Sequence, residues 1–355
     1  MGAGGIRWFI FCALLLTPVS GSAEPEAQLQ QKALFYHGQT YGSEASFNPA
    51  SSFVNWTVDT LQVPKNFTEQ GLHRSFDDTV DSLLHPDWAM RKEGGYTNFV
   101  KRQIVPLSGK LAESKEAVPN YFLHLFGGGM VYRKNVEWFE ANGYTHPKLA
   151  AVTLVMTAEF LQEVIEKKST PADDPVADFY LFRPAGILLF SWEPAARFAA
   201  ETLHLVEWPH QPMISTRSGD FANVGENFAV RPALFGSDRT RPFVFFGLTT
   251  LAGLSHKLDE TDSFSWGAGA AITSGVVNNV SVRPSYGAFY DRNDSQLWSL
   301  IVNGTDDLAV RLNIFPEVVR FGSWSPGFYL GIGDHGDYSV GVVVTMVPVG
   351  LAFDL

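Results

Sequence analysis

The side chains best suited to chemistry form one acidic stripe. The segment HPKLAAVTLVMTAEFLQEVIEKK predicts a helix, because Pro147 suits a first turn and lysines suit the last turn. Within it, Glu159, Gln162, Glu163 and Glu166 follow the i, i+3/i+4, i+7 spacing that places side chains on one helix face. Several carboxylates on one face can serve proton transfer or ligate a metal.

Two further residues extend this stripe into a candidate group. His124 precedes the helix and Asp178 follows it, and with Glu159 and Glu163 they form the predicted catalytic set, a general acid and base or a metal site acting on lipid headgroups. The other interpretation is structural: buried salt bridges in which Arg183 neutralises Asp178. The pattern identifies no metal or cofactor, and the segment FGGGM lacks the Lys-Ser/Thr pair of a phosphate-binding loop.

Helices are expected to position these residues, in a mainly helical region at 24–225. SFDDTVDSLLHPDW predicts a short helix that ends before Pro86. NYFLHLFGGGMVYRKNVEWFEANGY is helical in composition but interrupted by glycines 127–129. The segment from DPVADFY to LHLVEW predicts two more helical pieces, broken at Pro184 and Pro194.

From residue 226 to 355 the pattern changes to period two. In DSFSWGAGAAITS, bulky residues alternate with Ser and Gly, which predicts a strand whose two faces meet different environments. Arginines among the small residues of later segments favour a narrow polar lumen. Eight such segments, separated by short acidic turns, predict an α+β protein whose C-terminal part is an antiparallel β-barrel of about eight strands.

The ends and the composition limit the location. Residues 1–23 carry one Arg, an apolar run and a small-residue cleavage site, which predicts a secretory signal peptide. The only cysteine, Cys12, lies within it. The net charge of −11 argues against a nucleic-acid partner. After the signal peptide no apolar run of about 20 residues remains, so membrane insertion would have to use strands.

The chain ends in Gly350-Leu351-Ala352-Phe353-Asp354-Leu355, a glycine followed by alternating bulky apolar residues. This ending resembles the C-terminal assembly signal of Gram-negative outer-membrane β-barrel proteins, although Leu355 stands where Phe is usual. The resemblance implies the cell outer membrane as the location, with membrane lipid and the outer-membrane assembly machinery as partners. The alternative is a soluble, lipocalin-like barrel in the periplasm.

A second resemblance concerns the helical region. The order His124, Glu159 with Gln162, Asp178 and Gly186 is similar to the helical core of VanZ-like membrane proteins. It covers roughly sixty residues and implies no settled chemistry.

Two functions are therefore expected. The first is a non-enzymatic envelope protein, structural or handling lipids or ligands, whose helices plug or cap a barrel too narrow for a general pore. The alternative is an outer-membrane lipid-modifying enzyme, a hydrolase or acyltransferase, that uses His124, Glu159 and Asp178.

Overall fold

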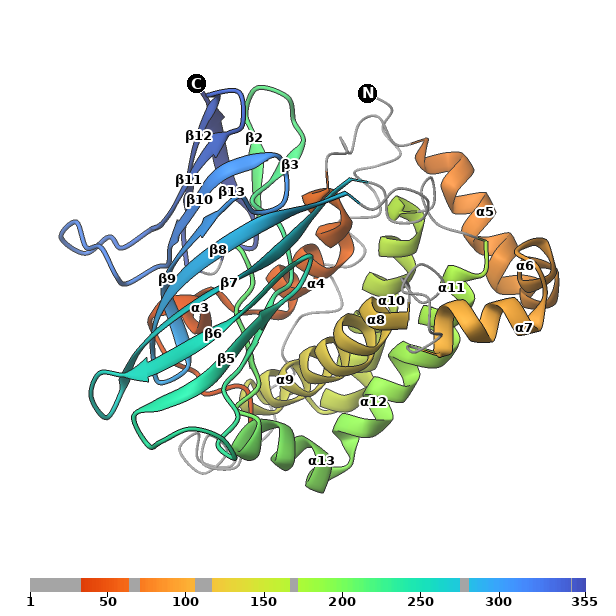
Figure 1. Ribbon diagram of the computed structural model, residues 1–355, viewed down its shortest axis with the longest axis horizontal. Helices are drawn as coiled ribbons and strands as arrows, with labels where there is room; N and C mark the ends of the chain where they lie inside the picture. Colours follow the sequence, from red (N-terminus) through yellow and green to blue (C-terminus); the bar gives the residue numbers. More distant parts are fainter. Residues whose placement is uncertain (1–32, 64–70, 106–116, 167–171, 275–280, 346) are drawn as a thin grey trace.

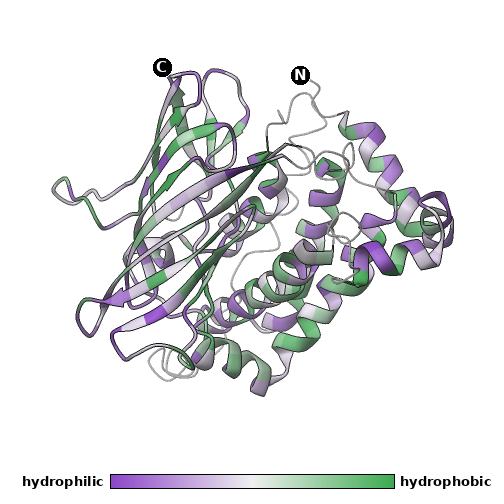
Figure 2. Cartoon of the chain, viewed as in Figure 1, coloured by the Kyte–Doolittle hydropathy of each residue, from purple (hydrophilic) through white to green (hydrophobic). Residues whose placement is uncertain are grey.

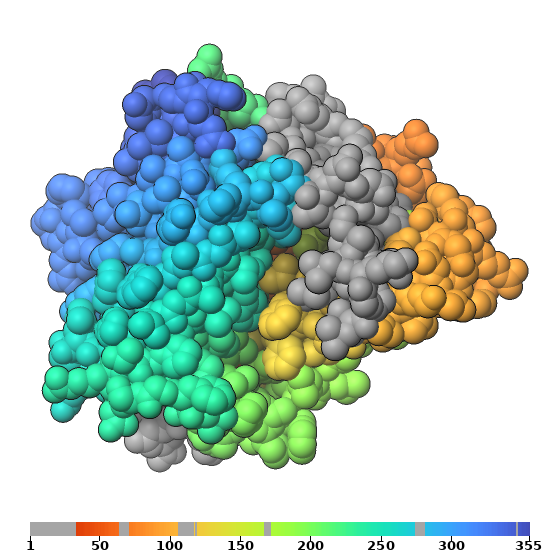
Figure 3. All heavy atoms as spheres, in the orientation of Figure 1, coloured from red at the N-terminus to blue at the C-terminus, as the bar shows by residue number. Residues whose placement is uncertain are grey.

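The chain folds into a helical layer and one large sheet. The computed structural model describes residues 33–63, 71–105, 117–166, 172–274, 281–345 and 347–355. The predicted signal peptide, 1–23, lies outside the described residues. Helices come first along the chain and the curved sheet follows, which confirms the α+β class (Figure 1). On the face seen in Figure 3, the two parts lie side by side. Within the described residues, no helix combines the length and the apolar character that crossing a membrane requires.

The helical layer consists of α-helices together with short 3-10 and π-helical segments, which carry the label η. They are α3 (Gly42–Ser46), α4 (Pro49–Val58), η2 (Asp59–Gln62), α5 (Leu72–Leu84), α6 (Pro86–Lys92), α7 (Tyr96–Phe99), η4 (Val100–Ile104), α8 (Ala117–Pro119), η6 (Asn120–Gly127), α9 (Gly128–Ala141), α10 (Pro147–Glu166), α11 (Asp174–Ala177), η7 (Asp178–Phe182), α12 (Arg183–Ser191), α13 (Glu193–Arg197) and η8 (Phe198–Thr202). The predicted helices at α5 and α10 are confirmed.

Two predicted interruptions are wrong. The helix continues through glycines 127–129, because η6 is a π-helix that runs directly into α9. It also continues through Pro184, where the π-helical turns of η7 lead into the first turn of α12. A proline in the first turn lacks only a donor that the helix does not need there. The expected break at Pro194 is confirmed, since α12 ends at Ser191 and α13 begins at Glu193 with Pro194 in its first turn.

The glycines let two helices approach closely. A Cβ at Gly129 would lie 2.6 Å from the carbonyl oxygen of Gly186, and one at Gly128 would collide with the Arg183 guanidinium. Side chains at these positions would push α9 away from α12. The glycine run therefore allows a close helix pair that brings Arg183 into the interior.

The sheet has 13 strands in the order β1-β4-β5-β6-β7-β8-β9-β10-β11-β12-β13-β2-β3, and all its pairings are antiparallel except β13 with β2. The strands are β1 (Val206–Glu207), β2 (Met213–Ser215), β3 (Phe221–Ala222), β4 (Phe228–Val230), β5 (Thr240–Phe246), β6 (Thr249–Lys257), β7 (Asp262–Ser274), β8 (Ser281–Arg292), β9 (Ser295–Val302), β10 (Leu308–Ile314), β11 (Gly327–Gly333), β12 (Tyr338–Val343) and β13 (Gly350–Asp354).

The described residues after 226 hold ten strands rather than the eight expected. Two segments that each looked like one strand fold as antiparallel pairs, β5 with β6 and β12 with β13. Each is longer than an ordinary strand, and turns at 247–248 and before Gly350 divide them. The last strand, β13, pairs with β2 on the side away from β12, not with β4, the first strand after residue 226. Pairing among the described strands ends at β1 and β3, so the sheet is not closed by hydrogen bonds.

The chain nevertheless brings the two ends of this order together. Only residues 208–212 separate β1 from β2, so the two strands lie at most about 20 Å apart. Eleven strand intervals lie between them in the sheet order, which would span about 50 Å in a flat sheet. The sheet must therefore curl. The 208–212 segment passes inside the curve, where the Gln211 amide donates to the carbonyls of Ile314 on β10 and Phe328 on β11.

The two faces of the sheet have opposite characters. On the outer face Trp266 is 46% exposed and Tyr286 54%, while on the inner face Ser265 and Ser285 are fully buried. Along the strands, the small and polar residues predicted for one face do turn inward, and the bulky ones turn outward. Figure 2 shows hydrophobic residues on the strands and hydrophilic residues at the hairpin turns at lower left.

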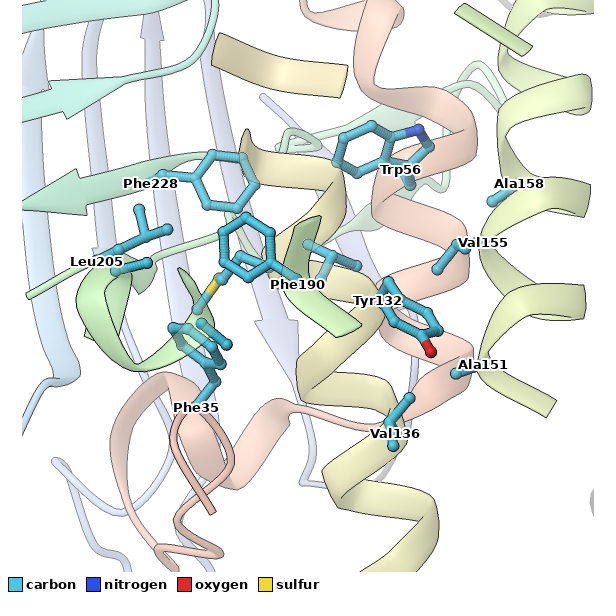
Figure 4. Close-up of a cluster of buried hydrophobic side chains, with 14 of the residues drawn as sticks. Phe35, Trp56, Tyr132, Val136, Ala151, Val155, Ala158, Phe190, Leu205 and Phe228 are labelled. Carbon is cyan, nitrogen blue, oxygen red and sulfur yellow. The ribbon is translucent and has the colours of Figure 1, made fainter. Parts of the chain in front are cut away.

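The interior is a mixture rather than a purely polar lumen. Arg311 and Asn313 of β10 are buried polar residues. Trp208, by contrast, packs against Phe243 of β5 and Phe289 of β8 in an apolar cluster. The main core lies between the layers. Figure 4 shows Trp56 of α4 standing between the sheet and α10.

Candidate functional site

The predicted catalytic residues meet in the helical layer. His124 lies in η6 and Asp178 begins η7, so both occupy π-helical turns, while Glu159 comes from the middle of α10. The His124 Nδ1 atom lies 2.6 Å from Glu159 Oε1, and His124 Nε2 lies 3.8 Å from Asp178 Oδ2. The structure thus brings three of the four predicted residues together in one group, the Glu159 network.

Glu159 is surrounded by donors. Its second oxygen, Oε2, accepts from the Trp56 indole nitrogen at 2.9 Å and from Arg183 Nε at 2.8 Å, with a further bond from Arg183 Nη2. The Arg183 guanidinium carbon also lies 3.7 Å from the centre of the Trp56 ring. Cation–π stacking therefore adds to the ion pair.

Arg183 was predicted to neutralise Asp178, and that pairing is wrong. Arg183 instead binds Glu159, because α9 and α12 approach closely and turn the guanidinium toward α10. Asp178 lies on the other side of the His124 ring, beside Nε2. Glu163, one helical turn after Glu159, is also buried.

The two acids of the network ionise in opposite ways. Burial opposes ionisation of Glu159, but Arg183 and His124 outweigh it and lower the pKa of Glu159 to about 2. Burial raises the pKa of Asp178 well above its usual value, and the neighbouring carboxylates of Asp174, Glu163 and Glu159 raise it further. Glu159 is therefore a stable anion, whereas the surroundings of Asp178 oppose its ionisation.

The side chains of His124, Glu159 and Asp178 fit a metal ion poorly in this arrangement. The ligand atoms of His124, Glu159 and Asp178 lie within 4.8 Å of one another. The 2.6 Å contact between His124 and Glu159 is a hydrogen-bond distance and leaves no room for an ion between those two atoms. All three side chains are also buried. The arrangement suits a charge-paired lock between helices and a proton held on Asp178.

Sequence reasoning missed Trp56 altogether. It lies in NPASSFVNWTV, about a hundred residues before its partner Glu159, and no spacing rule connects the two. The available signal was local: Asn48 caps α4 with a capping box, which marks a helix beginning there. The role of Arg183 depended on glycines that were taken for interruptions.

No protein-family model, no curated protein and no solved structure matches this chain.

Proposed function

We propose that this protein is an outer-membrane envelope protein. Its curved sheet forms a lipid-facing wall, and its helical layer packs against the sheet and caps it. Its role is structural, or it handles lipids or other ligands, and membrane lipid and the outer-membrane assembly machinery are its partners.

The observation that carries this proposal is the outer face of the sheet. Strands far apart in sequence expose large apolar side chains on it, while serines and asparagines face inward. The exposed residues include Leu254, Trp266, Val282, Tyr286, Tyr338, Val340, Leu351 and Phe353. A sheet in water places its apolar face inward, and soluble proteins rarely expose apolar patches of this extent. Strands of a membrane barrel alternate apolar-out and polar-in.

The curl of the sheet supports a barrel-like wall. The five-residue link between β1 and β2 draws the two ends of the strand order together, as a closing barrel requires. We propose that strands β4–β13 form the lipid-facing wall, in place of the eight strands first expected. The short strands β1–β3 and the 208–212 segment would line the place where the two ends of the sheet approach each other.

Fractionation of envelopes, followed by comparison of unboiled and boiled samples on a gel, tests the proposal. We expect the protein in the outer-membrane fraction, with a faster-migrating unboiled band. A soluble periplasmic protein without a mobility shift would contradict the outer-membrane location.

A matched pair of arginine substitutions tests the lipid-facing wall directly. Trp266→Arg places a charge on the outer face, and Glu260→Arg places the same charge at a hairpin turn. In a bilayer we expect Trp266→Arg to cost about 2–4 kcal/mol of folding free energy and Glu260→Arg to cost almost nothing. Equal tolerance of both substitutions would show that water covers this face.

The alternative is a lipid-modifying enzyme, a hydrolase or acyltransferase that uses His124, Glu159 and Asp178. It rests on the 2.6 Å contact between His124 and Glu159 and on the raised pKa of Asp178. If it is correct, Glu159→Gln abolishes activity in a protein that still assembles. An envelope lipid profile that neither deletion nor overexpression changes would exclude it.

A further inference from the structure

A second acidic group lies inside the curve of the sheet, where its two ends meet. A small cavity there has a volume of about 20 Å³, room for roughly one water-sized species. Its walls come from α3 and α4, from β1 and the 208–212 segment, from the residue at 226 before β4, and from residues at the ends of β10 and β12. We call it the seam cavity. The lining residues that matter below are Ser46, Glu207, Gln211 and Glu226.

These four residues carry five oxygen atoms to which no described group donates. Both carboxylate oxygens of Glu226, one oxygen of Glu207, the amide oxygen of Gln211 and the hydroxyl oxygen of Ser46 are buried. No donor among the described residues reaches these five atoms, although the carboxyls of Glu226 and Glu207 lie within hydrogen-bonding reach of each other. Glu226 itself is only 3% exposed. Buried carboxylates ordinarily accept hydrogen bonds or pair with a cation, so Glu226 lacks the partner that its burial calls for.

Lys134 supplies part of the missing charge but does not reach all the acids. Its ammonium lies 2.8 Å from Glu207 Oε2 and 2.7 Å from Glu44 Oε1, so it already bridges two carboxylates. Glu226 has no such salt bridge within the described chain. Burial raises the pKa of Glu226 well above its usual value, and the adjacent carboxyl of Glu207 and nearby Asp59 raise it further.

Asp59 completes the excess of negative charge. Its carboxylate accepts from the backbone nitrogen of Glu226 at 2.6 Å and from the Gln62 amide at 2.8 Å. Lys134 pairs with Glu44 and Glu207, and Asp59 lies beside Glu226, so the group holds four acids and one lysine and is short of positive charge.

We propose that the seam cavity binds one hard divalent cation of the calcium class. Carboxylates of Glu207 and Glu226, with neutral oxygens from Gln211 and Ser46, are the ligand types that Ca²⁺ prefers, and water can complete its shell. This site is separate from the Glu159 network and independent of the membrane proposal. Because its ligands come from the helical layer and from both ends of the sheet, a bound cation would hold the seam together.

Calcium binding by the full mature chain, purified in mild detergent and treated with a chelator that is then removed, tests this proposal. We expect calorimetric titration with Ca²⁺ to show one site, and Ca²⁺ to raise the thermal midpoint of unfolding. Glu226→Gln removes one charge and should weaken binding by more than about tenfold. Glu260→Gln, on an exposed hairpin turn, is the matched control and should bind like the parent chain.

Two results would overturn the proposal. One is the absence of Ca²⁺ binding to the parent chain, which would mean that protons alone neutralise these carboxyls. The other is unchanged binding by Glu226→Gln, which would place the ion elsewhere. If that variant does not fold, Glu226→Asp keeps the charge but withdraws it by one methylene, and it should also weaken binding.

Discussion

Glu159 and Glu226 are both buried carboxylates, yet one is surrounded by donors and the other by acceptors. Glu159 accepts from Trp56, Arg183 and His124. Glu226 accepts from none of the described residues and lies beside Glu207. Burial alone therefore does not indicate what a buried acid does. A fully bonded carboxylate fixes the elements around it, whereas one that lacks donors is available to a ligand or a proton.

Removing Glu159 should give the largest loss of stability. Glu159→Leu leaves the Arg183 guanidinium buried without its counter-charge, and we expect the free energy of unfolding to fall by about 3–5 kcal/mol. Denaturant unfolding in detergent measures it. Glu201→Leu is the matched control, because Glu201 also pairs with an arginine, Arg197, but on the exposed surface. A comparable loss in both variants would contradict the idea of a buried lock.

The pH dependence of stability should have opposite signs at the two groups. The pKa of Glu159 is lowered from 4.5 to about 2, so its ionised form contributes about 3 kcal/mol above pH 4.5, which is lost as the pH falls through 2. The pKa of Asp59 beside Glu226 is raised from 3.8 to about 7, so its contribution is full below pH 3.8 and is lost as the pH rises through 7.

Unfolding midpoints measured against pH with chelator present check these signs. Asp59→Asn should flatten the profile between pH 4 and 7, and Glu159→Gln should flatten it between pH 4.5 and 2. If Asp59→Asn leaves the neutral part of the profile unchanged, Asp59 ionises in the fold as it does in the unfolded chain, and its pKa is not raised.

A smaller loss should follow removal of one donor from the Glu159 network. Trp56→Phe keeps an aromatic ring beside Arg183 but removes the indole N–H that donates to Glu159. A hydrogen bond to a charged group is worth about 2 kcal/mol, so we expect a loss of that size in denaturant unfolding. Trp138→Phe, on the same helical layer but without a described bond to Glu159, is the control. Similar losses in both would point to ring volume rather than the donor.

Periodicity predicted much of this fold. The spacing in α10 placed Glu159 and Glu163 on one buried face, and the period-two segments gave the strands and their inward polar face. These signals are local, because each depends on the repeat of one element. The strand count was wrong where the turn between two strands was too short to interrupt the pattern, as at 247–248.

Partners distant in the chain were not predictable in the same way. The binding of Arg183 to Glu159 depends on how closely α9 and α12 pack, which no single segment determines. The seam cavity was even less predictable, because Ser46, Glu207 and Glu226 come from separate elements. Their meeting depends on the curl of the whole sheet, and nothing in the pattern around each residue indicates it.

The smallest effect should come from Glu226→Gln, set against the same chemical change at Glu159. Glu159→Gln replaces an oxygen that accepts hydrogen bonds with an amide group that repels the Arg183 and Trp56 donors, so stability should fall. Glu226→Gln instead places an amide that can donate beside the unbonded oxygen of Glu207. With chelator present, we expect its stability to stay within about 1 kcal/mol of the parent chain, or to rise. Thermal unfolding of both variants at pH 7 gives the comparison, and a large loss in Glu226→Gln without any cation would mean that Glu226 is held by bonds as Glu159 is.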